Sequence, residues 1–145
     1  RKIIITENEP FNTRKQDEEE IKNSITSHPK FQTLIHKIEV FEKNQDFLRK
    51  NITLDSLSKE FDTNRDYLSK LINELKGKNF TQYLNELRIN YIVSELKTNE
   101  KMRKYTIAAI SEEIGFNNSE TFTNAFKKIT GTLPSYYIKL LNEEN

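Results

Sequence analysis

Two stretches of the chain carry amide, hydroxyl and cationic side chains at the spacing of one helix face. The first polar face consists of Asn64, Arg65, Asp66, Ser69, Lys70 and Asn73. The second polar face consists of Asn118, Ser119, Glu120, Thr123, Asn124, Lys127 and Lys128. Amide, guanidinium and ammonium groups pair with base edges in the major groove, and cationic groups also contact phosphates. The two faces therefore offer hydrogen-bonding chemistry suited to a nucleic-acid duplex.

The residue types suggest a division of roles within these faces. Arg65 and Lys70 are candidates for guanine edges or phosphates, and Asn73 and Asn124 are candidates for adenine edges. The adjacent cations of Lys127–Lys128, together with the free amides at the start of each helix, are better suited to the sugar-phosphate backbone.

The acidic members of the faces fit phosphates poorly. Asp66 and Glu120 are expected either to accept a hydrogen bond from a cytosine amino group or to orient a neighbouring side chain. Each position taken alone is equally well explained as an ordinary solvated polar residue. The functional interpretation therefore depends on the two faces together.

A repeat in the sequence places these faces. A unit that begins at Leu57 recurs at Ile110, and one extra residue lies in the second turn. The apolar positions of the second helix in each copy, with its closing glycine, are Leu68, Leu71, Ile72, Leu75 and Gly77, matched by Phe122, Ala125, Phe126, Ile129 and Gly131. Apolar residues at this period predict amphipathic helices, and the same pattern twice predicts two similar folded units.

The predicted elements are all helical. The helices of the two units are expected at residues 54–61, 65–76, 107–114 and 119–130, with Thr53, Asn64, Thr106 and Asn118 as N-caps. Further helices are expected at residues 31–50, at residues 79–97, which link the two units, and from Pro134 to Leu141. The fold class is therefore all-α, with about seven helices forming two helix-turn-helix units joined by a long linking helix.

The predicted organisation has three parts. Residues 1–30 are expected to be a linker or tail, largely disordered or weakly helical, because the segment is polar and contains Pro10 and Pro29. Residues 31–97 are expected to form the first helix-turn-helix subdomain with the linking helix, and residues 98–145 the second. A linking helix of about 19 residues spans roughly 28 Å, close to the ~34 Å between successive major-groove turns.

The chain resembles the DNA-binding domain of AraC/XylS-type transcriptional regulators from Ile38 to Leu141. The similarity is strongest over residues 112–141, "EEIGFNNSETFTNAFKKITGTLPSYYIKLL", with Gly115–Phe116 in the turn and then Gly131 and Pro134. Residues 67–89, "YLSKLINELKGKNFTQYLNELRI", are similar to the family's first unit and linking helix. The chain departs from the family at four positions: Ser58 and Ser111 replace Ala, Ile72 replaces Phe, and Lys70 replaces Arg. Lysine lacks the bidentate fork of arginine, so guanine recognition at that position is less secure.

The resemblance implies a function and partners. It implies sequence-specific binding of double-stranded DNA by two helix-turn-helix motifs in successive major grooves, regulation of transcription, and groove contacts at the two polar faces. Duplex DNA is the implied partner, with RNA polymerase as a further candidate. The chain starts with Arg1, so an upstream sensing or oligomerising region is expected to be missing. The expected location is the cytoplasm, including the cytoplasmic end of a membrane-anchored regulator.

Composition narrows the other possibilities. The 145 residues carry a formal net charge of +1 and contain no cysteine. The 13 Lys and Arg residues of positions 52–145 are balanced by 13 Asp and Glu residues, which leaves open a helical protein-protein interaction module without DNA binding. The sequence contains no phosphate-binding glycine loop, no nucleophile elbow and no paired carboxylates with a plausible cleft, and His28 and His36 lack metal-site spacing. No enzyme activity, cofactor or metal is therefore expected.

Overall fold

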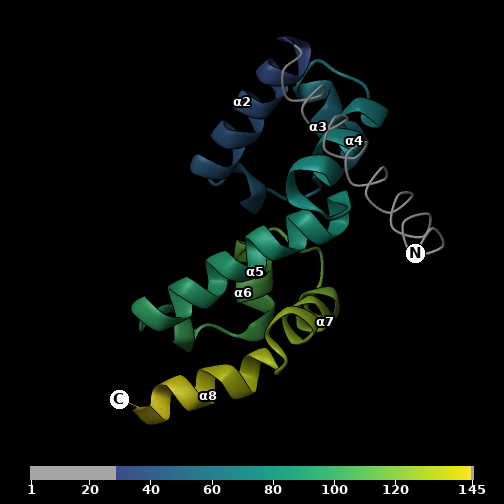
Figure 1. Ribbon diagram of the computed structural model, residues 1–145. Coiled ribbons are helices and arrows are strands. Elements are labelled where there is room, and N and C mark those ends of the chain that lie inside the picture. Colours follow the sequence, from purple (N-terminus) through teal and green to yellow (C-terminus); the bar gives the residue numbers. More distant parts are fainter. Residues whose placement is uncertain (1–28, 145) are drawn as a thin grey trace, which may run out of the picture. The chain divides into compact units, whose positions relative to one another are not determined.

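The computed structural model describes residues 29–144, and every regular element in that range is helical (Figure 1). The elements are α2 (Pro29–Lys43), the 3-10 helix η1 (Asp46–Leu48), α3 (Leu54–Glu60), α4 (Arg65–Lys76), α5 (Phe80–Thr98), the 3-10 helix η2 (Met102–Lys104), α6 (Ile107–Glu113), α7 (Ser119–Thr130) and α8 (Pro134–Glu144). The chain divides into two compact parts, Arg1–Glu39 and Val40–Asn145. The predictions for residues 1–28, including the tail and His28, lie outside the described residues.

The all-α fold predicted from the sequence is confirmed, and so is the repeat. Helices α3 and α4 form the first helix-turn-helix unit, α6 and α7 form the second, and α5 links them (Figure 1). The short helix has 7 residues and the second helix 12 residues in both units. The two copies therefore agree in length element by element.

Local hydrogen bonds explain where these helices begin and end. The side-chain oxygens of all four predicted N-caps accept a backbone N–H from the first turn: Thr53 from Ser56, Asn64 from Tyr67, Thr106 from Ala109 and Asn118 from Thr121. Such a cap stabilises a helix by about 1 kcal/mol. Gly77 and Gly131 end α4 and α7 in the left-handed conformation, with φ of 68° and 86°.

The extra residue of the second turn can be identified from the backbone. The Thr63 N–H donates to the Ser58 carbonyl in the first turn, and the Phe116 N–H donates to the Ser111 carbonyl in the second. Since Asn64 and Asn118 are the matching N-caps, Asn117 is the residue without a counterpart. The insertion therefore lies directly before α7.

The turn residue directly before Thr63 in the first copy, and directly before Phe116 in the second, has a positive φ. Its environment differs between the two copies. Asp62 adopts φ 56° and is exposed, whereas Gly115 adopts φ 92° and is buried. A Cβ atom on Gly115 would lie 2.7 Å from the carbonyl oxygens of Leu48 and Arg49 and 2.8 Å from Arg88 Nη2. Glycine is therefore required at residue 115 by its neighbours as well as by its backbone.

Aromatic side chains fill the core. Phe80, Tyr83, Phe116, Phe122 and Phe126 are buried, and Tyr137 is half-buried. In the second unit, the rings of Phe116, Phe122, Phe126 and Tyr137 contact one another in sequence order, with centroids 5.7 to 5.8 Å apart. Before the first unit, Phe41 of α2 contacts Phe47 of η1 and Phe61 at the end of α3 edge-on, with centroids 6.4 and 6.2 Å apart. Such pairs add to the free energy gained from burial.

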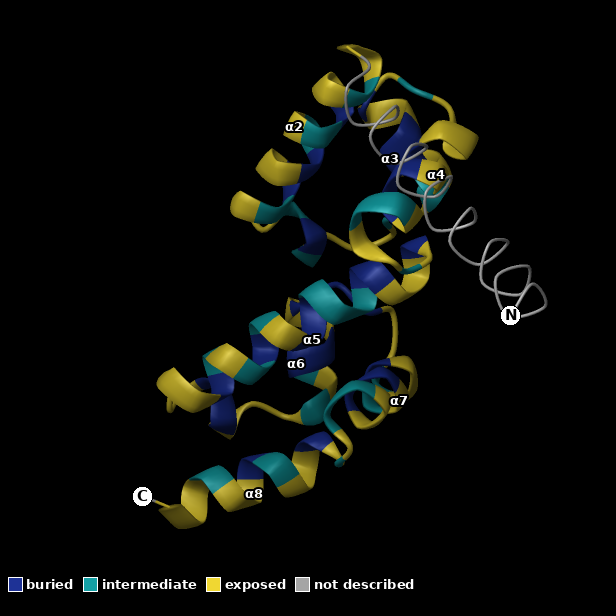
Figure 2. Ribbon diagram, in the orientation of Figure 1, coloured by how far each residue is buried: buried dark blue, intermediate teal, exposed yellow. Residues whose placement is uncertain are grey.

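Helix α5 is buried on more sides than one amphipathic stripe predicts. Leu87 and Tyr91 are half-buried, whereas Arg88, Ile89 and Ile92 are fully buried. The reason is that α5 contacts α4 of the first unit and the preceding η1 on one side. It also contacts α7 of the second unit, together with η2 and α8. A helix packed between two units has no single solvent face along its length (Figure 2).

The helix predicted at residues 31–50 ends earlier than expected, at Lys43. Gln45 takes a left-handed conformation with φ 59°, and η1 follows directly. This break turns the chain so that Phe47 is buried against Phe41 and Tyr91. The helical pattern of the sequence continues past Lys43, but burial of Phe47 against these rings requires the chain to turn there.

Two glycine substitutions test the packing at residue 115. Gly77→Ala, where a Cβ would meet nothing within 4 Å, is expected to lower the free energy of unfolding by about 1 kcal/mol through backbone strain alone. Gly115→Ala adds an overlap with two carbonyl oxygens and is expected to cost about 3 kcal/mol. Urea unfolding followed by circular dichroism compares the two variants, and equal midpoints would contradict the close approach.

Candidate nucleic-acid interface

The structure leaves both polar faces accessible. Helices α4 and α7 each have one buried side and one exposed side (Figure 2). Of the predicted residues, Ser69, Ser119 and Thr123 are half-buried and the others are exposed. Each helix presents the predicted residues on the side opposite its buried apolar positions, such as Leu68 and Phe122.

On the first polar face, two of the predicted residues have partners within the chain. Arg65 Nη1 lies 3.4 Å from Asp55 Oδ1, and both side chains are about 60% exposed. Such an exposed ion pair contributes little stability and exchanges readily for another partner. The Asn73 amide donates to the Ser69 carbonyl at 3.0 Å, so its oxygen is the group left to accept a bond.

On the second polar face, Asn118 has a structural role. Its side-chain oxygen accepts from the Thr121 N–H and from the Thr121 hydroxyl, both at 2.8 Å. This leaves the Asn118 amide nitrogen as its remaining donor. Asn64 caps α4 in the same way, through the Tyr67 N–H at 2.9 Å.

The lysines divide into paired and unpaired groups. Lys50 pairs with Glu112 at 3.0 Å, Lys76 with Glu42 at 3.1 Å and Lys78 with Glu86 at 2.6 Å. In the part of the chain that the structure describes, Lys70, Lys127 and Lys128 of the polar faces form no ion pair. The overall neutrality of the repeat region therefore hides local positive charge on these faces.

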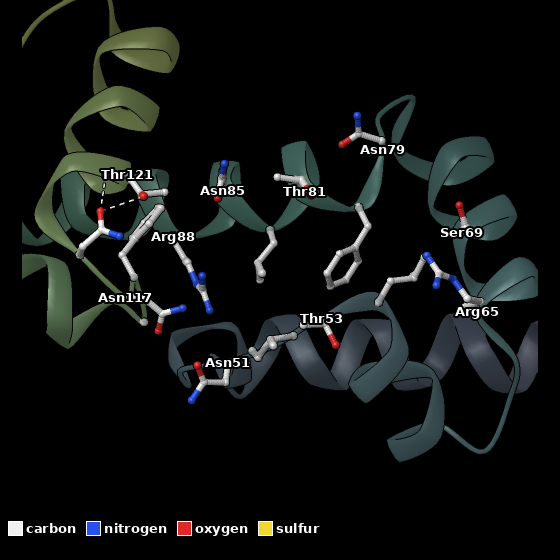
Figure 3. Close-up of a pocket in the computed structure, with 17 residues that line it drawn as sticks. Asn51, Thr53, Arg65, Ser69, Asn79, Thr81, Asn85, Arg88, Asn117 and Thr121 are labelled. Atoms are coloured by element: carbon white, nitrogen blue, oxygen red, sulfur yellow. Dashed lines mark hydrogen bonds between the residues drawn. The ribbon is translucent and has the colours of Figure 1, made fainter.

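A cleft of about 670 Å³ lies between the two polar faces (Figure 3). Arg65 and Ser69 of the first face line one end, and Asn118 with Thr121 of α7 lines the other. The residues between the ends come from α5, from the segment before α3 and from the second turn: Asn51, Ile52, Thr53, Leu54, Asn79, Phe80, Thr81, Leu84, Asn85, Arg88, Gly115, Phe116 and Asn117. None of these described lining residues is Asp or Glu.

Sequence reasoning missed most of this cleft. Asn51, Thr81 and Asn85 lie outside the two helix-turn-helix motifs, and no local pattern brings them together. Asn117 could have been noticed, because it is the extra residue of the second turn.

Arg88 lies at the floor of the cleft and joins three segments of the chain. Its Nε donates to the Phe47 carbonyl and its Nη2 to the Arg49 carbonyl, both at 2.7 Å. Its guanidinium carbon lies 5.4 Å from the centroid of the Phe116 ring, which belongs to the second turn. Arg88 thus connects the segment that precedes the first unit, the linking helix and the second unit.

Burial alters the acidity of this group without removing its charge. Arg88 is only 6% exposed, and desolvation lowers the pKa of its guanidinium from 12.5 to about 10. It is therefore positively charged at neutral pH. A sequence signal existed, because Leu84, Arg88 and Ile92 follow one another at intervals of four, so a cation interrupts an apolar stripe.

Two features of the described residues bear on other classes of site. Across residues 29–144, no helix is both long and apolar enough to cross a membrane. Over the same range, no three His, Cys, Asp or Glu side chains lie together in a way that would hold a metal ion.

Comparison with known families identifies the domain type. The helix-turn-helix domain family matches residues 57–139, which cover α6, α7 and most of the first unit. The chain belongs to this family, in its AraC-type form, and the resemblance found in the sequence is confirmed.

Individual relatives agree with this assignment. The transcriptional regulatory protein YesN of Bacillus subtilis is 37% identical over 75 residues, which is 51% of this chain and 20% of YesN. The chain thus spans about one fifth of the length of that relative.

Solved structures share the fold. The C-terminal domain of AraT, a response regulator from Geobacillus stearothermophilus, is 25% identical with a TM-score of 0.64, covering 78% of this chain and 86% of that one. The DNA-binding domain of AdpA, solved in complex with a target DNA, has the same TM-score at 18% identity, covering 74% of this chain and 94% of that one. At 18% identity, the similarity to the AdpA domain is a similarity of fold.

The arginine at the floor of the cleft can be tested by a conservative change. Arg88→Lys keeps the charge but cannot reach both carbonyls, and one unpaired buried carbonyl is expected to cost about 2 kcal/mol of unfolding free energy. The matched control is Arg49→Lys, whose side chain is half-exposed and pairs with Glu60, with an expected cost below about 1 kcal/mol. Equal unfolding midpoints for the two variants would show that Arg88 does not tie the segments together.

Proposed function

We propose that this domain binds double-stranded DNA in a sequence-specific manner, with α4 and α7 in successive major grooves, and that it regulates transcription. The observation that carries the proposal is the pair of accessible polar faces, one on the second helix of each helix-turn-helix unit. A helix of this kind fits the major groove, where its side chains reach base edges.

The linking helix supports simultaneous binding of two grooves. Helix α5 has 19 residues and is therefore roughly 28 Å long. Successive major-groove turns on one side of a duplex are about 34 Å apart. Because Arg88 ties the segment before the first unit and the turn of the second unit to α5, we infer that the two faces are held in one relative orientation. A single chain can then read an asymmetric site.

The chemistry of the faces supports base reading at some positions and backbone contact at others. We assign base-edge contacts to Arg65, Lys70, Asn73 and Asn124, which are exposed. Backbone contacts are assigned to Lys127 and Lys128. Asn64 and Asn118 act first as caps, so their contribution to binding is through the remaining amide nitrogen.

Relatives of the domain support the regulatory role. YesN is described as a transcriptional regulatory protein, and AdpA, a global transcriptional factor, was solved on a target DNA. For the whole regulator, we propose that a sensing or oligomerising region supplies the signal. We also propose that the protein works in the cytoplasm with RNA polymerase as a partner.

Selection from a random duplex library tests the proposal directly. The purified domain is expected to enrich one asymmetric motif with two half-sites about one helical turn apart, with affinity that falls steeply as salt rises. The protein-interaction alternative predicts that no motif is enriched at any salt concentration. That result would overturn the proposal.

Substitutions of two lysines distinguish contacts to base edges from contacts to the DNA backbone. Lys70→Ala is expected to cost about 1–3 kcal/mol of binding free energy on the selected site and to relax base preference at one position. Lys128→Ala is expected to weaken all duplexes alike and to lower the slope of log affinity against log salt by about 1. Lys97→Ala, at an exposed lysine near the end of α5, is the matched control and is expected to bind as the parent does. Fluorescence anisotropy titrations at several salt concentrations measure all three, and identical effects of the first two changes would contradict the assignment.

A further inference from the structure

We propose that the cleft between the two polar faces is a third DNA contact, which binds the phosphodiester backbone of the duplex segment between the two major grooves. This inference rests on the proposed function and adds a set of residues that lie outside both helix-turn-helix reading helices. Those residues are Asn51, Thr81, Asn85 and Asn117, with the buried Arg88 beneath them.

The charge of the cleft fits an anion. Positions 52–145 carry equal numbers of acidic and basic residues, yet the described lining of the cleft contains two arginines and no carboxylate. One of the two, Arg88, is buried and charged at neutral pH, so solvent screens it less than it screens a surface lysine. The described lining thus carries positive charge without a carboxylate of its own, and Asp55 pairs with Arg65 at one end of the cleft.

The remaining lining groups fit phosphate oxygens rather than base edges. They are mostly neutral amides and hydroxyls, which donate hydrogen bonds to phosphate and sugar without carrying sequence information. Figure 3 shows Thr81 and Asn85 along α5, Asn51 and Thr53 across from them, and Asn117 near Arg88. These donors beside a cation are suited to phosphodiester oxygens, and apolar side chains such as Phe80 and Leu84 make up the rest of the lining.

The position of the cleft between the two polar faces indicates that its ligand is the bound duplex itself. Its two ends are made by residues of the polar faces, namely Arg65 and Ser69 at one end and Asn118 at the other. A duplex held by both faces must therefore pass over the cleft, and the part of it between two successive major grooves presents the minor groove with a sugar-phosphate backbone on each side. Asn117, the residue inserted in the second turn, lies beside this path.

Isosteric charge changes test the cleft. Asn85→Asp and Asn117→Asp each place one negative charge in the cleft without altering side-chain volume, and each is expected to weaken binding of the selected duplex by at least about tenfold at low salt. The control is Asn90→Asp, which makes the same change at an exposed position of α5 outside the cleft. It is expected to weaken binding by less than about threefold, because exposed charges farther away are screened.

Neutral backbone linkages test the same contact from the DNA side. Methylphosphonates placed between the two half-sites remove phosphate charge there, and they are expected to weaken binding by the parent protein several-fold. The same linkages placed outside both half-sites are expected to have no effect. For Asn85→Asp and Asn117→Asp, the central linkages are expected to weaken binding much less, because the repulsion is relieved together with the attraction.

The outcomes separate this proposal from the one on which it rests. If the parent protein enriches no duplex, the proposed function fails. If the parent protein binds its site but the two cleft variants bind as tightly as Asn90→Asp, only the cleft proposal is overturned. Circular dichroism melts confirm that each variant is folded, and Asn117→Asp, which lies in a turn, keeps the test valid if Asn85→Asp disturbs α5.

Discussion

The structure depends on one contact, where the Arg88 side chain meets the backbone of residues 47–49 and the Gly115–Phe116 turn. Two carbonyls accept from the guanidinium at 2.7 Å, and the Phe116 ring lies against it. Gly115 is small enough to allow the carbonyls of Leu48 and Arg49 to approach. A buried charge with fixed acceptors permits few alternative arrangements, so this contact sets how the two helix-turn-helix units face.

The same contact links the stability of the domain to the proposed binding geometry. The segment that leads into α3 and the turn that leads into α7 are joined at Arg88, and both also line the cleft between the polar faces. The exposed pair between Lys50 and Glu112 joins the first of these segments to α6, and it contributes little stability. Buried polar contacts thus fix the geometry of the two faces that we propose to enter successive grooves, while the faces themselves carry lysines without an ion pair.

Much of the fold followed from local sequence patterns. The four N-caps, the two closing glycines and the equal helix lengths of the repeat were predicted, because each depends on residues within one turn of the chain. The burial of Arg88 and Ile89 and the early end of α2 at Lys43 were not, because they depend on packing between distant segments. The polar faces are exposed as expected, and their individual DNA contacts remain predictions.

The sequence by itself determined the class of fold, the repeat and the identity of the two polar faces, since helical periodicity and capping are written in neighbouring residues. Only the tertiary structure showed how the two copies of the repeat differ. Asp62 and Gly115 occupy the same turn position with positive φ, yet only Gly115 is enclosed by the carbonyls of another segment. Likewise, only the folded chain brings Asn51, Asn85 and Asn117 into one cleft, because residues far apart in sequence meet through packing around α5.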